Sequence, residues 1–128
     1  MNTQLLKSMV SPMKSVQMAL AELLAVTEER MSDKKDGYTK YIQEEFNEFM
    51  AEKDGTPEQA KELGDLLWVV IQKANKQGYD LAKILQMLVD EYSSKFYDEN
   101  GEFNPIYRED GKLLKNKGFK KLDLTKIL

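Results

Sequence analysis

Acidic side chains gather in two short stretches of the sequence. Glu44, Glu45 and Glu48 lie in the first stretch, and Glu62 and Asp65 lie in the second. Residues three or four apart on an α-helix are neighbours on one face, with about 5–6 Å between their Cβ atoms. If each stretch is helical, it therefore presents a small cluster of carboxylates. Oxygen ligands without nitrogen or sulfur favour Mg²⁺ or Mn²⁺, so the pattern indicates metal-assisted chemistry.

The composition excludes most other kinds of site. The 128 residues include no cysteine and no histidine. Disulfides, thiolate nucleophiles, Cys-type zinc sites, imidazole bases and Ser-His-Asp triads are therefore excluded. A ferritin-like di-metal oxidase needs Glu-x-x-His pairs and is excluded in its usual form. A calcium loop starting at Asp98 fails because its sixth position is Phe103, where an EF-hand needs glycine.

The two acidic stretches are mirrored about Gly55. Positions 48 and 62 are equally distant from residue 55, and so are positions 45 and 65. In an antiparallel helical hairpin, residues equally distant from the turn lie at the same level. Glu48 is therefore predicted to face Glu62, and Glu45 to face Asp65 one helical turn deeper. Four carboxylates are expected to converge on one small volume.

The acids are also expected to lie beside the apolar stripes of their helices, partly buried between them. Buried like charges raise one another's pKa and destabilise the hairpin unless a cation neutralises them. The alternative is an ordinary solvated acidic face, because glutamate is a strong helix former. The mirrored spacing favours the metal site, as does the scarcity of basic partners. Lys40 and Lys61 are the only Lys or Arg placed four residues from these acids.

The elements that position the acids are predicted to be helices joined by short breaks. Ser11-Pro12 and Thr56-Pro57 each combine a side-chain cap with a proline at the first helical position. Helices are predicted from residue 12 to about 27, over 38–52, from 57 to near 78, and from 81 onward, with Asp80 capping the last. Ile42, Phe46 and Phe49 form the apolar stripe of the second. Residues 2–10 are a short helix or a frayed end, and 32–37 are a loop.

The pattern changes from Asp98 onward. Asn100-Gly101 and Asp110-Gly111 are turn signals, and the second is flanked by apolar pairs at 106–107 and 113–114. This predicts a small hairpin. The expected architecture is one all-α domain over 1–128, with a four-helix-bundle-like core at about 12–97 and an irregular or hairpin C-terminal extension at 98–128.

The bulk composition suits a well-solvated protein. Hydrophobic residues make up 41% and charged residues 32%, with a net charge of −3. The charge balance is too mild to indicate a nucleic-acid polymer as partner. No run of about 18 apolar residues and no signal-peptide pattern occurs, so no membrane association and a cytoplasmic location are expected.

Glu44-Glu45-Phe46-Asn47-Glu48 and Glu62-Leu63-Gly64-Asp65 resemble the EExxE…ExxD signature of the all-α nucleotide pyrophosphohydrolases. That superfamily includes MazG, the dimeric dUTPases and the phosphoribosyl-ATP pyrophosphohydrolases. The run from Glu62 to Trp68 looks especially MazG-like, and the resemblance covers about residues 12–97. Residues 94–96 and 105–112 are similar to the C-terminal part of short, phage-type members.

The resemblance implies a MazG fold and hydrolysis of (deoxy)nucleoside triphosphates to a monophosphate and pyrophosphate. It implies that Glu45, Glu48, Glu62 and Asp65 bind Mg²⁺ or Mn²⁺, and that Glu44 assists as ligand or base. A homodimer or homotetramer is also implied, and the host cytoplasm is the expected location if the protein is phage-encoded. The sequence departs from the family at Tyr92, where members often carry Lys or Asn for phosphate or base contacts.

The expected mechanism is attack of water on the α-phosphorus, with Glu44 or Glu45 orienting or deprotonating the water. Lys95, Arg108 and Lys112 are candidates to neutralise phosphates, although ordinary surface charge is the simpler explanation for each. Trp68 could stack on the base, with core packing as the alternative. Two other functions stay open. One is a dUTPase-like or phosphoribosyl-ATP pyrophosphohydrolase-like activity, and the other is a non-catalytic acidic module that binds a basic partner.

Overall fold

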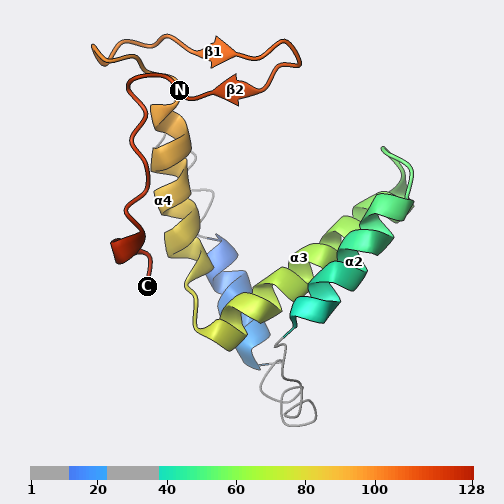
Figure 1. The fold of residues 1–128 in the computed structure, drawn as a ribbon. Coiled ribbons are helices and arrows are strands. Elements are labelled where there is room, and N and C mark those ends of the chain that lie inside the picture. The colour runs from blue at the N-terminus through green and yellow to red at the C-terminus, as the bar shows by residue number, and fades with distance from the viewer. Residues whose placement is uncertain (1–11, 23–37) are drawn as a thin grey trace. The chain divides into compact units, whose positions relative to one another are not determined.

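The computed structural model describes residues 12–22 and 38–128 (Figure 1). Residues 12–22 are helical, and the other helices are α2 (Thr39–Ala51), α3 (Pro57–Gln77) and α4 (Leu81–Ser94). Strands β1 (Ile106–Tyr107) and β2 (Leu113–Leu114) and the 3-10 helix η1 (Leu124–Lys126) follow. The predicted all-α class with a small C-terminal hairpin is thus confirmed. The predictions for Ser11 and for residues 2–10, 23–27 and 32–37 lie outside the described residues.

The chain divides into two compact units. One unit comprises residues 15–81, with α2 and α3, and the other contains residues 82–128. All five acids singled out above belong to the first unit. The fold of that unit therefore decides how the acids are arranged.

The turn between α2 and α3 is held by local hydrogen bonds. Gly55 adopts a left-handed backbone with φ of 79°. The Thr56 side chain caps α3 by accepting a hydrogen bond from the Gln59 backbone N–H at 3.2 Å, with Pro57 at the first helical position. The Gln59 side chain folds back, accepting from the Gly55 N–H at 3.1 Å and donating to Asp54. The turn therefore fixes the start of α3 relative to the end of α2, as the predicted cap and glycine break require.

The far end of α3 is anchored to the helix over residues 12–22. The Gln17 side chain is buried, donates to the Tyr79 carbonyl at 2.7 Å and accepts from the Leu81 N–H at 3.1 Å. Asn75 donates to the Gln17 carbonyl at 3.2 Å. These bonds satisfy the polar groups of a buried amide, which would otherwise be unfavourable. The apolar core of this unit includes Leu20, Tyr38, Val69, Ile71 and Ala74.

Two apolar side chains are more exposed than the sequence predicts. Phe46 of the predicted α2 stripe is 44% exposed, and Trp68 of α3 is 45% exposed. Ile42 and Phe49, the other members of the stripe, are half-buried. The α2–α3 hairpin thus partly buries some of its apolar side chains and leaves others on its surface.

The second unit is built around α4 and its C-terminal segment. Ile106 pairs with Leu114 and Tyr107 with Leu113 in the antiparallel hairpin predicted around Asp110-Gly111. The chain then runs back along α4, where the Glu91 carboxylate accepts from the Leu122 N–H at 2.6 Å. Among the described helices, none is long and apolar enough to cross a membrane.

The stability of the α2–α3 hairpin should be especially sensitive to a side chain at Gly55. Gly55→Ala should lower the free energy of unfolding by about 1–2 kcal/mol, because L residues disfavour the left-handed region. Gly55→Asn should cost less, since asparagine visits that region more readily. Thermal or urea unfolding of the metal-free protein measures both effects.

Gly64 supplies the matched control within the same hairpin. A Cβ there meets nothing within 4 Å, and its φ is not positive. Gly64→Ala should be neutral or stabilising by up to about 1 kcal/mol, because alanine favours helix. Equal destabilisation at positions 55 and 64 would contradict this account of the turn.

Candidate metal centre

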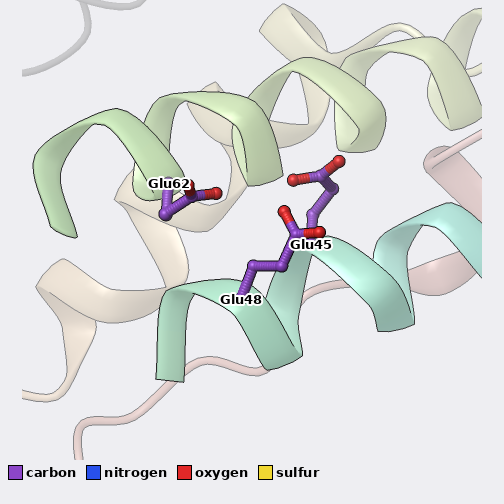
Figure 2. Close-up of side chains that lie close together, drawn as sticks. All are labelled: Glu45, Glu48 and Glu62. Atoms are coloured by element: carbon purple, nitrogen blue, oxygen red, sulfur yellow. The ribbon is translucent and has the colours of Figure 1, made fainter. Parts of the chain in front are cut away.

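The carboxylates of Glu45, Glu48 and Glu62 point into the space between α2 and α3 (Figure 2). One oxygen from each residue lies within 4.8 Å of those of the other two. Glu45 and Glu48 are one turn apart on α2, and Glu62 faces them from α3. The mirrored spacing about Gly55 therefore predicted correctly that Glu48 and Glu62 come together across the hairpin.

Asp65 lies beside this group of three but is engaged elsewhere. Its Oδ2 atom accepts a hydrogen bond from Lys61 Nζ at 2.5 Å, one helical turn back along α3. Its charge still reaches the cluster, because it contributes to raising the pKa of Glu45. The structure thus brings three of the four predicted metal ligands together and places the fourth next to them, paired with a lysine.

Two carboxylate oxygens in the cluster are buried without a partner. Within residues 12–22 and 38–128, Glu45 Oε2 and Glu62 Oε2 are shielded from solvent and accept no hydrogen bond. The rest of each side chain is only half-buried, so it is the oxygens that turn inward. An unsatisfied buried polar atom is unfavourable, and more so when it belongs to a charged group. The hairpin therefore holds acceptor atoms that a positive charge between the two helices would satisfy.

The pKa values of the cluster show the same conflict. The pKa of Glu45 is raised by burial, then by the hydrogen bond and the charge of Glu48, and then by the charges of Asp65 and Glu62. The pKa of Glu62 is raised by burial and by Glu48 and Asp65, with Lys61 opposing the shift. Protonation relieves such repulsion, and so does a bound cation.

The residues present fit a hard divalent cation. All the available ligands are carboxylate oxygens, which Mg²⁺ and Mn²⁺ prefer, and the chain offers no histidine or cysteine for a softer metal. One oxygen of each residue lies within 4.8 Å of the other two, whereas at a bond length of about 2.1 Å the ligands of an octahedral magnesium site lie about 3 Å apart when adjacent and about 4 Å apart when opposite. The flexible glutamate side chains would have to close on the ion to reach coordination distance.

The other predicted site residues lie outside the group of three. Glu44 is exposed on α2, with its carboxylate 3.9 Å from Lys40 Nζ. Trp68 lies on α3 with 45% of its surface exposed, so it is not the core residue considered as its alternative role. Lys40 was recognised from its spacing, and the position of the acids beside the apolar stripes predicted that they would be partly buried. Which of their oxygens turn inward carried no sequence signal.

The three candidate phosphate-binding cations belong to the second unit. Lys95 Nζ lies 4.8 Å from the centre of the Tyr92 ring. Arg108 makes a two-pronged ion pair with Asp110 inside the hairpin turn, which raises the pKa of Arg108 and lowers that of Asp110. Lys112 is exposed at the other side of that turn.

Comparison with known protein families gives a match to part of the chain. The family model of the MazG nucleotide pyrophosphohydrolase domain matches residues 34–95. The matched segment contains α2, α3, α4 and all five acids. No curated protein and no solved structure matches the chain significantly.

The raised pKa of Glu45 predicts how the metal-free protein responds to acid. A carboxyl whose pKa is raised on folding binds its proton more tightly in the folded state. Its ionised form therefore disfavours folding above the folded-state pKa, and this penalty vanishes below the unfolded-state value. Glu45→Gln lacks the penalty, so at neutral pH in chelator it should unfold at a higher temperature than the wild type. The gap should narrow as the pH falls towards the ordinary carboxyl pKa, and a gap that is constant with pH would contradict the cause assigned here.

Proposed function

We propose, from the match of residues 34–95 to the MazG nucleotide pyrophosphohydrolase domain, that the protein is a divalent-cation-dependent hydrolase of (deoxy)nucleoside triphosphates. The products are a nucleoside monophosphate and pyrophosphate. The observation that carries the proposal is the pair of buried, unpartnered oxygens of Glu45 and Glu62. They meet Glu48 between α2 and α3, where an ion would satisfy all three.

Glu45, Glu48 and Glu62 would hold the ion, with Asp65 as the fourth ligand beside them. Mg²⁺ is the proposed ion and Mn²⁺ its substitute, because both take carboxylate oxygens. When bound, the ion supplies charge neutralisation for the phosphate oxygens and a lower pKa for a coordinated water. The protein contributes a rigid hairpin that keeps the ligands in place, since the turn at Gly55 and the cap at Thr56 fix the helix register.

The proposed reaction breaks the anhydride bond between the α- and β-phosphorus atoms. A water oxygen forms the new bond to the α-phosphorus, its proton passes to a carboxylate, and pyrophosphate leaves. Glu44 and Glu45 are the candidates for orienting or deprotonating that water. Glu45 contributes to the ligand group, whereas Glu44 is exposed and outside it, which favours Glu44 for the water.

The proposed substrate contacts are one aromatic side chain and three cations. Trp68 has an exposed ring surface, which suits stacking on a nucleobase. Lys95, Arg108 and Lys112 are proposed to neutralise phosphates. The Arg108 guanidinium already pairs with Asp110, so Lys95 and Lys112 are the stronger candidates.

We also propose that a second copy of the chain covers part of the α2–α3 hairpin, giving a homodimer or homotetramer. Phe46 and Met50 are four residues apart on α2, and Leu63 and Leu67 have the same spacing on α3. These four side chains are 44–63% exposed. Apolar strips of this kind are typical of association surfaces. A strictly monomeric, fully active protein would contradict this assignment.

The direct test of function is product analysis across a panel of NTPs, dNTPs and modified nucleotides. With Mg²⁺ or Mn²⁺, the protein should release pyrophosphate and the matching monophosphate, and excess EDTA should abolish the activity. A diphosphate plus phosphate would show attack at the γ-phosphorus and contradict the mechanism. Full activity in EDTA would reject the metal centre.

Three glutamate variants assign that activity to the cluster. Glu48→Gln and Glu62→Gln should each lower kcat by about 100-fold or more, since groups that stabilise the transition state electrostatically are worth that much. The double variant should be little worse than either single one, because ligands of one site act as a unit. Without metal, each variant should have a free energy of unfolding no lower than that of the wild type, because it lacks one repulsive charge.

Glu52→Gln is the matched control, one turn beyond Glu48 and just after the end of α2. It should have a comparatively mild effect on turnover. Equal, modest losses at positions 48, 52 and 62 would instead fit an acidic module that binds a basic partner through all of these charges.

A further inference from the structure

Lys61 contacts Asp65, one of the proposed ligands, and the proposed function gives this lysine no role. We propose that Lys61 is a built-in competitor of the metal ion, holding Asp65 in the metal-free protein and giving it up when the ion binds. The inference rests on the proposed function, because it needs a cation between α2 and α3. It assigns Lys61 the task of setting how tightly that cation is held.

The contact itself is short and local. Lys61 Nζ lies 2.5 Å from Asp65 Oδ2, and the two residues are four apart on α3. An oxygen that accepts a charged hydrogen bond at this distance is not free to coordinate an ion in the same geometry. Lys61 therefore occupies one of the two carboxylate oxygens of Asp65, the predicted ligand that lies outside the group of three.

The charge of Lys61 also reaches the rest of the cluster. Its pKa is raised by the hydrogen bond and charge of Asp65 first, and then by the charges of Glu62 and Glu45. In return, Lys61 opposes the rise in the pKa of Glu62. An ammonium that stabilises these carboxylates in the absence of metal must also repel a divalent ion that approaches the same carboxylates.

Exposure makes the competition reversible. The Lys61 side chain is 70% exposed and that of Asp65 is 38% exposed. A long, solvated lysine can swing away from its partner at little cost, because exposed ion pairs contribute weakly to stability. The Lys61–Asp65 pair therefore lowers the affinity for the metal ion without blocking the site.

The test measures Mn²⁺ binding by isothermal titration calorimetry, without nucleotide, in the wild type and in Lys61→Met. Methionine keeps the length and the apolar stem of lysine and removes its charge. At low ionic strength, the variant should bind Mn²⁺ about threefold to tenfold more tightly, as expected for removal of one charge several ångströms from a divalent ion. The difference should shrink at about 0.5 M KCl, where exposed charges are screened.

Thermal unfolding gives an independent readout. Without metal, Lys61→Met should unfold at a lower temperature than the wild type, because the carboxylates lose a counter-charge. Its gain in Tm on adding Mn²⁺ should be larger than the gain of the wild type, because tighter binding to the folded state stabilises it more.

Two variants control for charge and position. Lys61→Arg keeps the positive charge, so its Mn²⁺ affinity should equal that of the wild type or fall below it. Lys40→Met removes a lysine with the same i, i+4 spacing on α2, but its partner Glu44 lies outside the group of three and the separation is 3.9 Å. Its Mn²⁺ affinity should change by less than about twofold, since exposed pairs at that distance interact weakly.

The outcomes distinguish a failure of the inference about Lys61 from a failure of the proposed function. If the wild type binds Mn²⁺ and Lys61→Met binds it equally or more weakly, Lys61 positions Asp65 or does nothing, and the inference is overturned. If the wild type binds no Mn²⁺, the proposed function itself fails. If Lys40→Met strengthens binding as much as Lys61→Met does, the effect is general surface charge and the competition for Asp65 is rejected.

Discussion

The α2–α3 hairpin must hold several carboxylates close together against their mutual repulsion, and this constraint governs the rest of the structure around the site. Glu45, Glu48 and Glu62 lie close together, and two of their oxygens are buried without a partner. Such an arrangement is unfavourable unless protons or a cation neutralise it. The rigid turn and the anchored far end of α3 hold the helices in place against this repulsion. An ion bound at the proposed site would recover the energy that folding loses here.

Much of this hairpin could be predicted because its determinants are local in the sequence. Thr56 and Pro57 identify the start of α3, and Gly55 identifies a turn that only a left-handed residue fits easily. Once the turn is known, the helical repeat decides which residues on α2 and α3 lie opposite each other. The pairing of Glu48 with Glu62 followed from that count alone. The C-terminal hairpin was predictable for the same reason, since Asp110-Gly111 has apolar pairs at equal distances on either side.

Other features were not predictable because they depend on side-chain choices and on packing. The spacing placed Asp65 opposite Glu45, but Lys61 was equally well placed to bind it, and sequence does not decide between two partners one turn apart. The helical period placed Phe46 on the apolar stripe of α2 without showing what would cover it, and the hairpin leaves its side chain partly exposed. The same applies to Trp68. For both residues, burial depends on surfaces that lie beyond the hairpin itself.

The central claim is that α2 and α3 hold a divalent ion through glutamate oxygens, and diffraction from crystals grown with Mn²⁺ tests it most directly. Manganese scatters anomalously, so its position can be found without assuming any ligand. The account predicts an anomalous peak between the two helices at coordination distance from Glu45, Glu48 and Glu62. A well-ordered hairpin with no peak there, or with manganese bound only at other carboxylates, would contradict it.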